Sequence, residues 1–224
     1  MQPLPIPIPD QSAGFEEWLR LDREKLKKGE RTRLDLLLAA ARHLADQPLE
    51  SMTVAAMSQA AGVAHGTFYL YFKDRSHLAG EILSLFVDYL QIEMRLAARC
   101  ADDPIRSSTA SYFRLFEANS GLMKCLVVGM DSAPEARQAF QRLNNEWART
   151  VVRAQGRQRN PTAASNQNLS MEEQMRRAYA LGAMVDQYLT ALFVTKDPWI
   201  VELSNDPEAT IDTLTTLWKK GMGA

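Results

Sequence analysis

Two short apolar segments lie close together near the N-terminus and are separated by a short turn that contains a glycine. The first, residues 54–61, follows Thr53, whose hydroxyl can cap a helix, and the second covers roughly residues 64–72. Gly62 stands between them and can supply the positive φ with which a chain leaves a helix. Over residues 31–47, leucine and alanine recur at helical spacing. A long helix followed by two short ones around a tight turn predicts a helix-turn-helix.

The second short segment divides into an inner and an outer set of side chains. Val63, Phe68 and Phe72 are expected to point inward and to fix the helix to its scaffold. The remaining residues are left to face the major groove of DNA, which is about 12 Å wide: Ala64, His65, Gly66, Thr67, Tyr69 and Tyr71. Because the His65 ring can donate a hydrogen bond to a guanine or thymine acceptor, we expect it to be the main base-reading residue.

Residues 53–75, TVAAMSQAAGVAHGTFYLYFKDR, resemble the signature of the TetR family of bacterial regulators. The shared pattern is a threonine, a short helix, Ala-Gly-Val, a small residue, any residue, Gly-Thr, an aromatic residue and Tyr, any residue, then Tyr-Phe and a lysine. Residues 36–40 also resemble the first helix of that family. This chain departs from the family pattern at Pro48, Ser58 and Ala64. Ala64 replaces a common serine, whose hydroxyl could hold a phosphate.

The resemblance implies DNA-contacting roles for residues inside and outside the second helix. Phosphate contacts hold the register of a protein on DNA, and base contacts specify sequence. Roles at the backbone or base edges are implied for Thr53, Thr67, Tyr69, Tyr71, Lys73 and Arg75, with Lys28, Arg31 and Arg33 upstream. Residues 20–33 carry seven basic and three acidic residues, a local charge of +4 in a chain whose net charge is −1. A solvated helix face is the alternative interpretation of this charge.

The rest of the chain also has helical spacing of its apolar residues, and it lacks the alternation of apolar and polar residues that is typical of strands. We therefore expect an all-α fold. Proline, serine and aspartate mark helix starts, and the expected helices cover residues 12–28, 31–47, 54–61, 64–72, 74–96, 104–118, 121–130, 134–156, 170–195 and 207–221, with a loop at 157–169. We divide the chain into an N-terminal extension (1–28), a three-helix DNA-binding domain (29–78) and a larger helical domain (79–224).

For residues 79–224 the resemblance implies a domain that binds a small molecule and dimerises. Methionine and aromatic residues suit an adaptable apolar cavity. The candidate lining residues are Phe86, Tyr89, Phe113, Phe116, Met123, Met130, Trp147, Met184 and Tyr188. Asp131, Arg177 and Asp186 are charged groups that could orient such a ligand. The composition favours an apolar or aromatic effector.

Small residues stand among large apolar ones in the helix near 171–195, and the helix near 207–221 offers large apolar residues. Two such helices from each subunit would form a four-helix homodimer interface. A dimer also has a functional reason, because two reading helices about 34 Å apart recognise a palindrome. Packing of these helices within one subunit is the alternative.

Other function classes find little support in the sequence. Cys100, Cys125 and the three histidines do not have metal-ligand spacing. We found no nucleophile elbow, phosphate loop or dinucleotide motif, and no apolar run long enough for a membrane span. We therefore expect no enzyme activity, metal, cofactor or membrane partner, and a cytoplasmic location. The predicted function is a repressor released from double-stranded operator DNA by a small molecule. The alternative is a helical interaction module or cofactor-binding protein without sequence-specific DNA binding.

Overall fold

The computed structural model describes residues 14–21, 23–99, 101–129, 133–158 and 169–223. These residues form helices and connecting turns, and no strand occurs among them, which confirms the expected all-α fold. In the same ranges, no helix combines the length and the apolar composition needed to cross a bilayer.

The N-terminal part consists of one long helix and several short ones. They are α1 (Phe15–Arg20), η1 (Arg23–Lys25), α2 (Lys28–Asp46), η2 (Leu49–Ser51), α3 (Val54–Ala60) and α4 (His65–Phe68). The second short segment of the sequence analysis, residues 64–72, is called the reading segment from here on. Its helix is shorter than predicted, because regular helix ends at Phe68 and residues 69–71 continue as a turn.

The larger part is a bundle of long helices with one short helix at its side. They are α5 (Arg75–Arg99), α6 (Pro104–Ala118), α7 (Ser120–Val127), α8 (Pro134–Gln158), α9 (Met171–Leu189), α10 (Pro198–Leu203) and α11 (Pro207–Met222), with a π-helical turn, η4 (Thr190–Val194), after α9. The sequence analysis missed α10, which begins at a proline and is capped by the side chain of Asp197.

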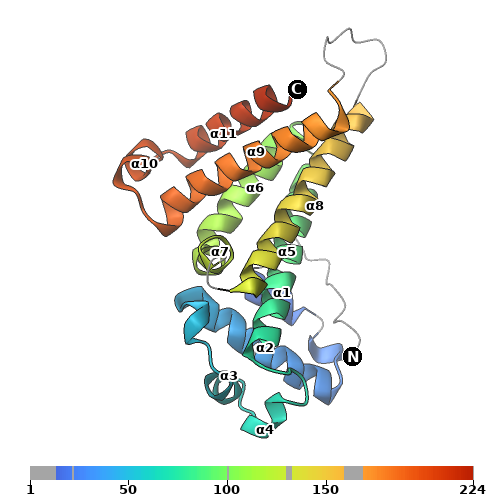
Figure 1. The fold of residues 1–224 in the computed structure, drawn as a ribbon, viewed down its shortest axis with the longest axis vertical. Helices are drawn as coiled ribbons and strands as arrows, with labels where there is room; N and C mark the ends of the chain where they lie inside the picture. Colours follow the sequence, from blue (N-terminus) through green and yellow to red (C-terminus); the bar gives the residue numbers. More distant parts are fainter. Residues whose placement is uncertain (1–13, 22, 100, 130–132, 159–168, 224) are drawn as a thin grey trace.

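The short helices α3 and α4 lie at one end of the elongated molecule, and α9 and α11 lie at the other (Figure 1). Helix α5 begins directly after the reading segment and runs into the bundle, where it packs along α6 and α8. The domain boundary expected near residue 78 therefore falls inside a continuous helix. Because a helix transmits displacement along its axis, α5 is the main mechanical link between the two parts.

Local sequence explains where most of these helices begin. The Thr53 hydroxyl accepts a hydrogen bond from the backbone N–H of Ala56 at 3.2 Å. In the same way Asp103 caps α6, and Ser170 accepts from the N–H of Glu173 at 3.1 Å to cap α9. Each cap satisfies backbone donors that a helix start leaves unpaired, so these boundaries are local properties of the chain.

The N-terminal extension is part of the folded core from Phe15 onward. Trp18 is fully buried, and its ring centroid lies 5.7 Å from that of Tyr89 on α5. Phe15 meets Phe86, also on α5, at 5.0 Å with an edge-on geometry. Helix α1 therefore packs against both α2 and α5, and it stabilises the junction between the two parts.

Candidate nucleic-acid interface and interior cavity

The turn between α3 and α4 is set by Gly62. Its φ is 68°, in the left-handed region that a β-carbon disfavours. Its N–H donates to the carbonyl oxygen of Gln59 at 3.1 Å, and the N–H of Val63 donates to that of Ser58 at 2.9 Å. These bonds end α3 and redirect the chain, so that α4 protrudes from the end of the molecule (Figure 1).

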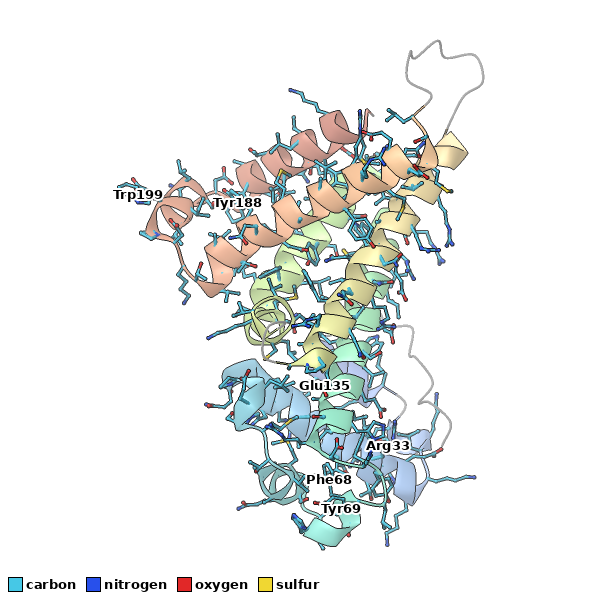
Figure 2. All side chains as sticks on the ribbon, in the orientation of Figure 1. Arg33, Phe68, Tyr69, Glu135, Tyr188 and Trp199 are labelled. Carbon is cyan, nitrogen blue, oxygen red and sulfur yellow. The ribbon has the colours of Figure 1, made fainter. Side chains whose placement is uncertain are left out.

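Two aromatic residues hold the protruding segment in place. Phe68 and Phe72 are buried, as predicted, and their ring centroids are 5.7 Å apart. Tyr69, by contrast, is 53% exposed beside them at the tip of the molecule (Figure 2). The segment is thus fixed by one face and presents the other to solvent.

The solvent face contains most of the predicted reading residues. Ala64, His65 and Gly66 are exposed, and Thr67 is half-buried. The His65 and Tyr69 rings meet edge to face with centroids 5.5 Å apart, so they form a single aromatic ridge. A ridge with ring N–H and O–H donors is suited to contact base edges and the sugar-phosphate backbone.

Gly66 is not required by the packing of the protein itself. A β-carbon built at this position meets no atom within 4 Å, and the residue has an ordinary negative φ. A glycine at this position leaves room for another molecule to come close to the backbone.

Tyr71 links the reading segment to the start of α2. It is half-buried, and its hydroxyl would lie 3.5 Å from a β-carbon on Gly29. Lys28 and Arg31, in the same first turn of α2, are exposed, as is Lys73 at the end of the segment. The structure therefore brings one hydroxyl close to the start of a helix that presents two basic side chains.

Two arginines predicted to contact DNA have partners within the protein. Arg33 is only 7% exposed, pairs with Glu81 on α5 and lies over the Phe72 ring at 5.5 Å. Arg75 donates from Nη1 to the carbonyl oxygens of Glu50 and Met52, at 2.9 and 3.1 Å. Arg33 thus anchors the reading segment from behind, which corrects the prediction for this residue, and Arg75 fixes the loop before α3.

Other charges of the basic segment are also neutralised within the protein. Arg20 pairs with Glu16 at 2.7 Å, and Arg23 pairs with Asp35 at 2.9 Å. The local charge of +4 therefore overstates the positive charge that this segment offers to DNA.

Leu70 was missed by the sequence analysis, although it is 74% exposed on the reading segment. An exposed leucine beside a reading helix can contact the methyl group of thymine. The sequence places Leu70 between two tyrosines but does not reveal which way it points.

A cavity of about 420 Å³ lies inside the bundle, between α5, α6, α8, α9 and α11. Its apolar wall includes Met94, Ile105, Leu143, Trp147, Val151, Val185 and Trp218. Tyr112 and Asp186 also line it, and the Tyr112 hydroxyl donates to Oδ1 of Asp186 at 2.7 Å. Asp186 was one of three charged residues that the sequence suggested as orienting groups for a ligand. Of the other two, Arg177 donates hydrogen bonds to Glu173 and to the carbonyl oxygen of Gly221, and Asp131 lies outside the described residues.

Of the nine side chains predicted to line a pocket, only Trp147 lines this cavity in the described structure. Phe86 and Tyr89 pack against α1, and Phe113 and Phe116 pack against Phe193. Met123 is buried in the core, and Met184 is half-buried. The Tyr188 hydroxyl is 2.7 Å from that of Ser204, and Met130 lies outside the described residues. Large side chains on the inner face of a helix stabilise the core more often than they line a cavity, and sequence spacing does not separate the two cases.

A family model described as bacterial regulatory proteins, tetR family, matches residues 36–82, which cover most of α2, all of α3 and α4, and the start of α5. The transcriptional repressor KstR2 of Mycolicibacterium smegmatis is 30% identical over 99 residues, which are 44% of this chain and 48% of that protein. The chain thus aligns with about half the length of this relative. The regulator EthR of Mycobacterium tuberculosis is 24% identical over 196 residues, covering 85% of this chain and 86% of that protein.

The fold as a whole also has solved counterparts. The regulator FadR of Bacillus subtilis, solved in complex with stearoyl-CoA, superposes with a TM-score of 0.64 at 17% identity, covering 84% of this chain and 98% of that one. The helix-turn-helix geometry, the family model over residues 36–82 and the shared fold agree. Residues 36–82, which carry the helix-turn-helix, are thus similar to the tetR family of bacterial regulatory proteins.

Proposed function

We propose that this protein is a transcriptional regulator that binds a palindromic DNA operator as a homodimer and is released from it by a small, mainly apolar molecule. One observation carries this proposal: the exposed His65–Tyr69 ridge is held by buried Phe68 and Phe72, inside the segment that matches the family. A surface fixed so firmly from behind can enter a groove without losing its shape.

The reading segment combines groups for two kinds of contact. His65, Tyr69 and Leu70 face outward and can meet base edges. Thr53, at the start of α3, together with Lys28, Lys73 and the Tyr71 hydroxyl, can hold phosphates. Arg31 adds a further exposed charge in the same turn of α2 as Lys28.

Dimerisation is proposed through α9 and α11. Both helices expose apolar side chains, Tyr179 at 42% and Leu217 at 44%, and the small residues Ala180 and Ala183 are also exposed on α9. Small residues allow a partner helix to approach closely, and the larger ones can fill the remaining space. This interface would lie at the opposite end of the molecule from α4 (Figure 1).

Release by a ligand is proposed to act through α5. The last turns of this helix line the cavity with Met94 and Ala98, and its first turn follows the reading segment. A ligand that favours one position of α5 over another changes the distance between the two reading helices of a dimer. It therefore shifts the population toward a form that fits the operator less well.

Selection of bound sequences from a random duplex library, using the full chain, tests the proposal. We expect enrichment of a palindrome whose half-sites are about one helical turn apart, or a multiple of it. Binding of the selected duplex should weaken steeply with salt, because several phosphates are contacted in each subunit. Enrichment of no sequence, or of one that binds no better than a scrambled duplex, would contradict it.

A further inference from the structure

The cavity contains one buried acceptor without a partner. Asp186 is 6% exposed, and its Oδ1 accepts from Tyr112 at 2.7 Å. Its Oδ2 is buried and has no hydrogen-bond partner in the described part of the chain. Leaving a buried carboxylate oxygen unpaired is costly, so such an atom beside a cavity indicates a missing donor.

Neighbouring polar groups of the cavity wall already have partners in the protein. The Ser108 hydroxyl donates to the carbonyl oxygen of Met94 at 3.3 Å, and that of Thr109 to Ile105 at 2.9 Å. Arg95 donates to Oε1 of Gln91 at 2.6 Å. Asp186 differs from these residues because one of its two oxygens is left over.

Among the described residues of the cavity wall, no arginine pairs with this carboxylate. Arg95 and Arg99 line the cavity from α5, but both are exposed. Burial raises the pKa of Asp186 to about 6, and the hydrogen bond from Tyr112 is the only influence that lowers it. At neutral pH the carboxylate is therefore mostly ionised and is balanced by one neutral hydroxyl.

The space beside Asp186 is open. Gly182 lies one helical turn before it on α9 and also lines the cavity, and a β-carbon on Gly182 would meet no atom within 4 Å. Two tryptophans, Trp147 and Trp218, contribute to the same wall. Aromatic rings that line a cavity together with a carboxylate are suited to bind organic cations.

We propose that the effector of this protein is an apolar molecule with one hydrogen-bond-donating group, an amine or a hydroxyl, which binds Oδ2 of Asp186. This inference rests on the proposed ligand-responsive function and adds the chemistry of the ligand. It also predicts selection against a carboxylate at the same position, because that group would face another anion at close range.

Three probes with one ring system test the assignment: 2-naphthylmethylamine, 2-naphthalenemethanol and 2-naphthoate. Binding is followed by tryptophan fluorescence and by the shift in melting temperature, both without DNA. The amine or the alcohol should bind the wild-type chain about tenfold or more tightly than naphthoate, since a hydrogen bond to a charged group has that effect. Which of the two binds better identifies the donor.

Two variants connect the binding to Asp186. Asp186→Asn should weaken the amine about tenfold or more, whereas the control Asp212→Asn, at an exposed carboxylate on α11, should leave its affinity unchanged. Gly182→Leu, which fills the space and keeps the carboxylate, should weaken all three probes. It also serves as the second variant if Asp186→Asn does not fold.

Naphthoate that binds as tightly as the better of the amine and the alcohol would overturn the proposal. Binding of none of the probes would also overturn it, as would an affinity for that better probe that both cavity variants leave unchanged. Because these titrations contain no DNA, their outcome is independent of operator binding. A probe that binds through Asp186 but fails to release the selected duplex would support the assigned ligand chemistry and contradict the proposed release mechanism.

Discussion

Gly121, in the first turn of α7, lies so close to Ala45, near the end of α2, that a β-carbon on Gly121 would overlap the carbonyl oxygen of Ala45. Next to this contact, the Cys125 thiol lies 3.8 Å from the carbonyl oxygen of Leu44. The N-terminal part and the bundle thus meet closely at α2 and α7, in addition to the continuous helix α5. A cavity of about 300 Å³ adjoins this junction.

Gly121→Ala should destabilise the protein, because the contacted atom belongs to the backbone and cannot rotate away. We expect a loss of about 1–3 kcal/mol in the free energy of unfolding, the usual range for overpacking a close contact. Urea denaturation followed by circular dichroism measures it. Gly182→Ala is the matched control, since its β-carbon enters open space and alanine favours a helix over glycine by roughly 0.5–1 kcal/mol. Equal stability of the two variants would show that the α2–α7 contact is not tight.

Asp186→Asn should stabilise the protein at neutral pH. The pKa of Asp186 is about 6 in the folded protein against an ordinary value of 3.8, so the folded state holds this proton more strongly than the unfolded state. The stability of the wild-type chain therefore falls as the pH rises from about 4 to 6, and the full loss of about 3 kcal/mol is present above pH 6.

The amide in Asp186→Asn can still accept from Tyr112 but cannot ionise. The gain in stability should be present at pH 8 and disappear at pH 4, as measured by urea denaturation at both values. A gain that is the same at both pH values would contradict the origin in buried charge. If Asp186→Asn is more stable at pH 8 and also loses probe binding, the Asp186 carboxylate serves ligand binding while it lowers the stability of the fold.

Gly66→Ala should separate stability from DNA binding. No atom of the protein lies within 4 Å of the new methyl group, so we expect unchanged or slightly higher stability. The methyl group would lie where DNA approaches the backbone, and we expect the affinity for the selected operator to fall on the order of tenfold, about 1.4 kcal/mol. Fluorescence anisotropy with a labelled duplex measures it; full affinity would place Gly66 outside the interface.

Gly182→Leu should bind DNA as the wild-type chain does and lose its response to the effector. The new side chain fills part of the cavity but is far from α4, so only the coupling between the sites should change. Anisotropy of the operator complex, with and without the naphthylmethylamine probe, checks this. A variant that is still released at the wild-type probe concentration would exclude this cavity as the regulatory site.

The sequence was most informative where function depends on local spacing. Gly62, with its positive φ, and the buried pair Phe68 and Phe72 follow from neighbouring residues, and the structure confirms them. Arg33 was misassigned because its charge is visible in the sequence, whereas its partner Glu81 is 48 residues away. Contacts at that distance depend on how helices pack, which periodicity does not specify.

The cavity was harder to predict for the same reason. Phe86 and Phe116 are buried, yet they pack against Phe15 and Phe193 and do not line the cavity. Asp186 was considered from the sequence without a position, and Tyr112, its partner 74 residues earlier, was not considered. A buried polar pair of this kind becomes visible only when the helices that carry it are placed side by side.

The affinities of Tyr71→Phe and His65→Ala for the selected operator, and for duplexes with single-base changes, test the reading surface most directly. Tyr188→Phe, at the far end of the molecule, is the control (Figure 2). Tyr71→Phe should weaken binding by a similar factor on every sequence, because its hydroxyl is assigned to a phosphate. His65→Ala should change the order of preference among the sequences, because its ring is assigned to a base. If both variants bind every duplex as the wild-type chain does, α4 is not the element that reads DNA.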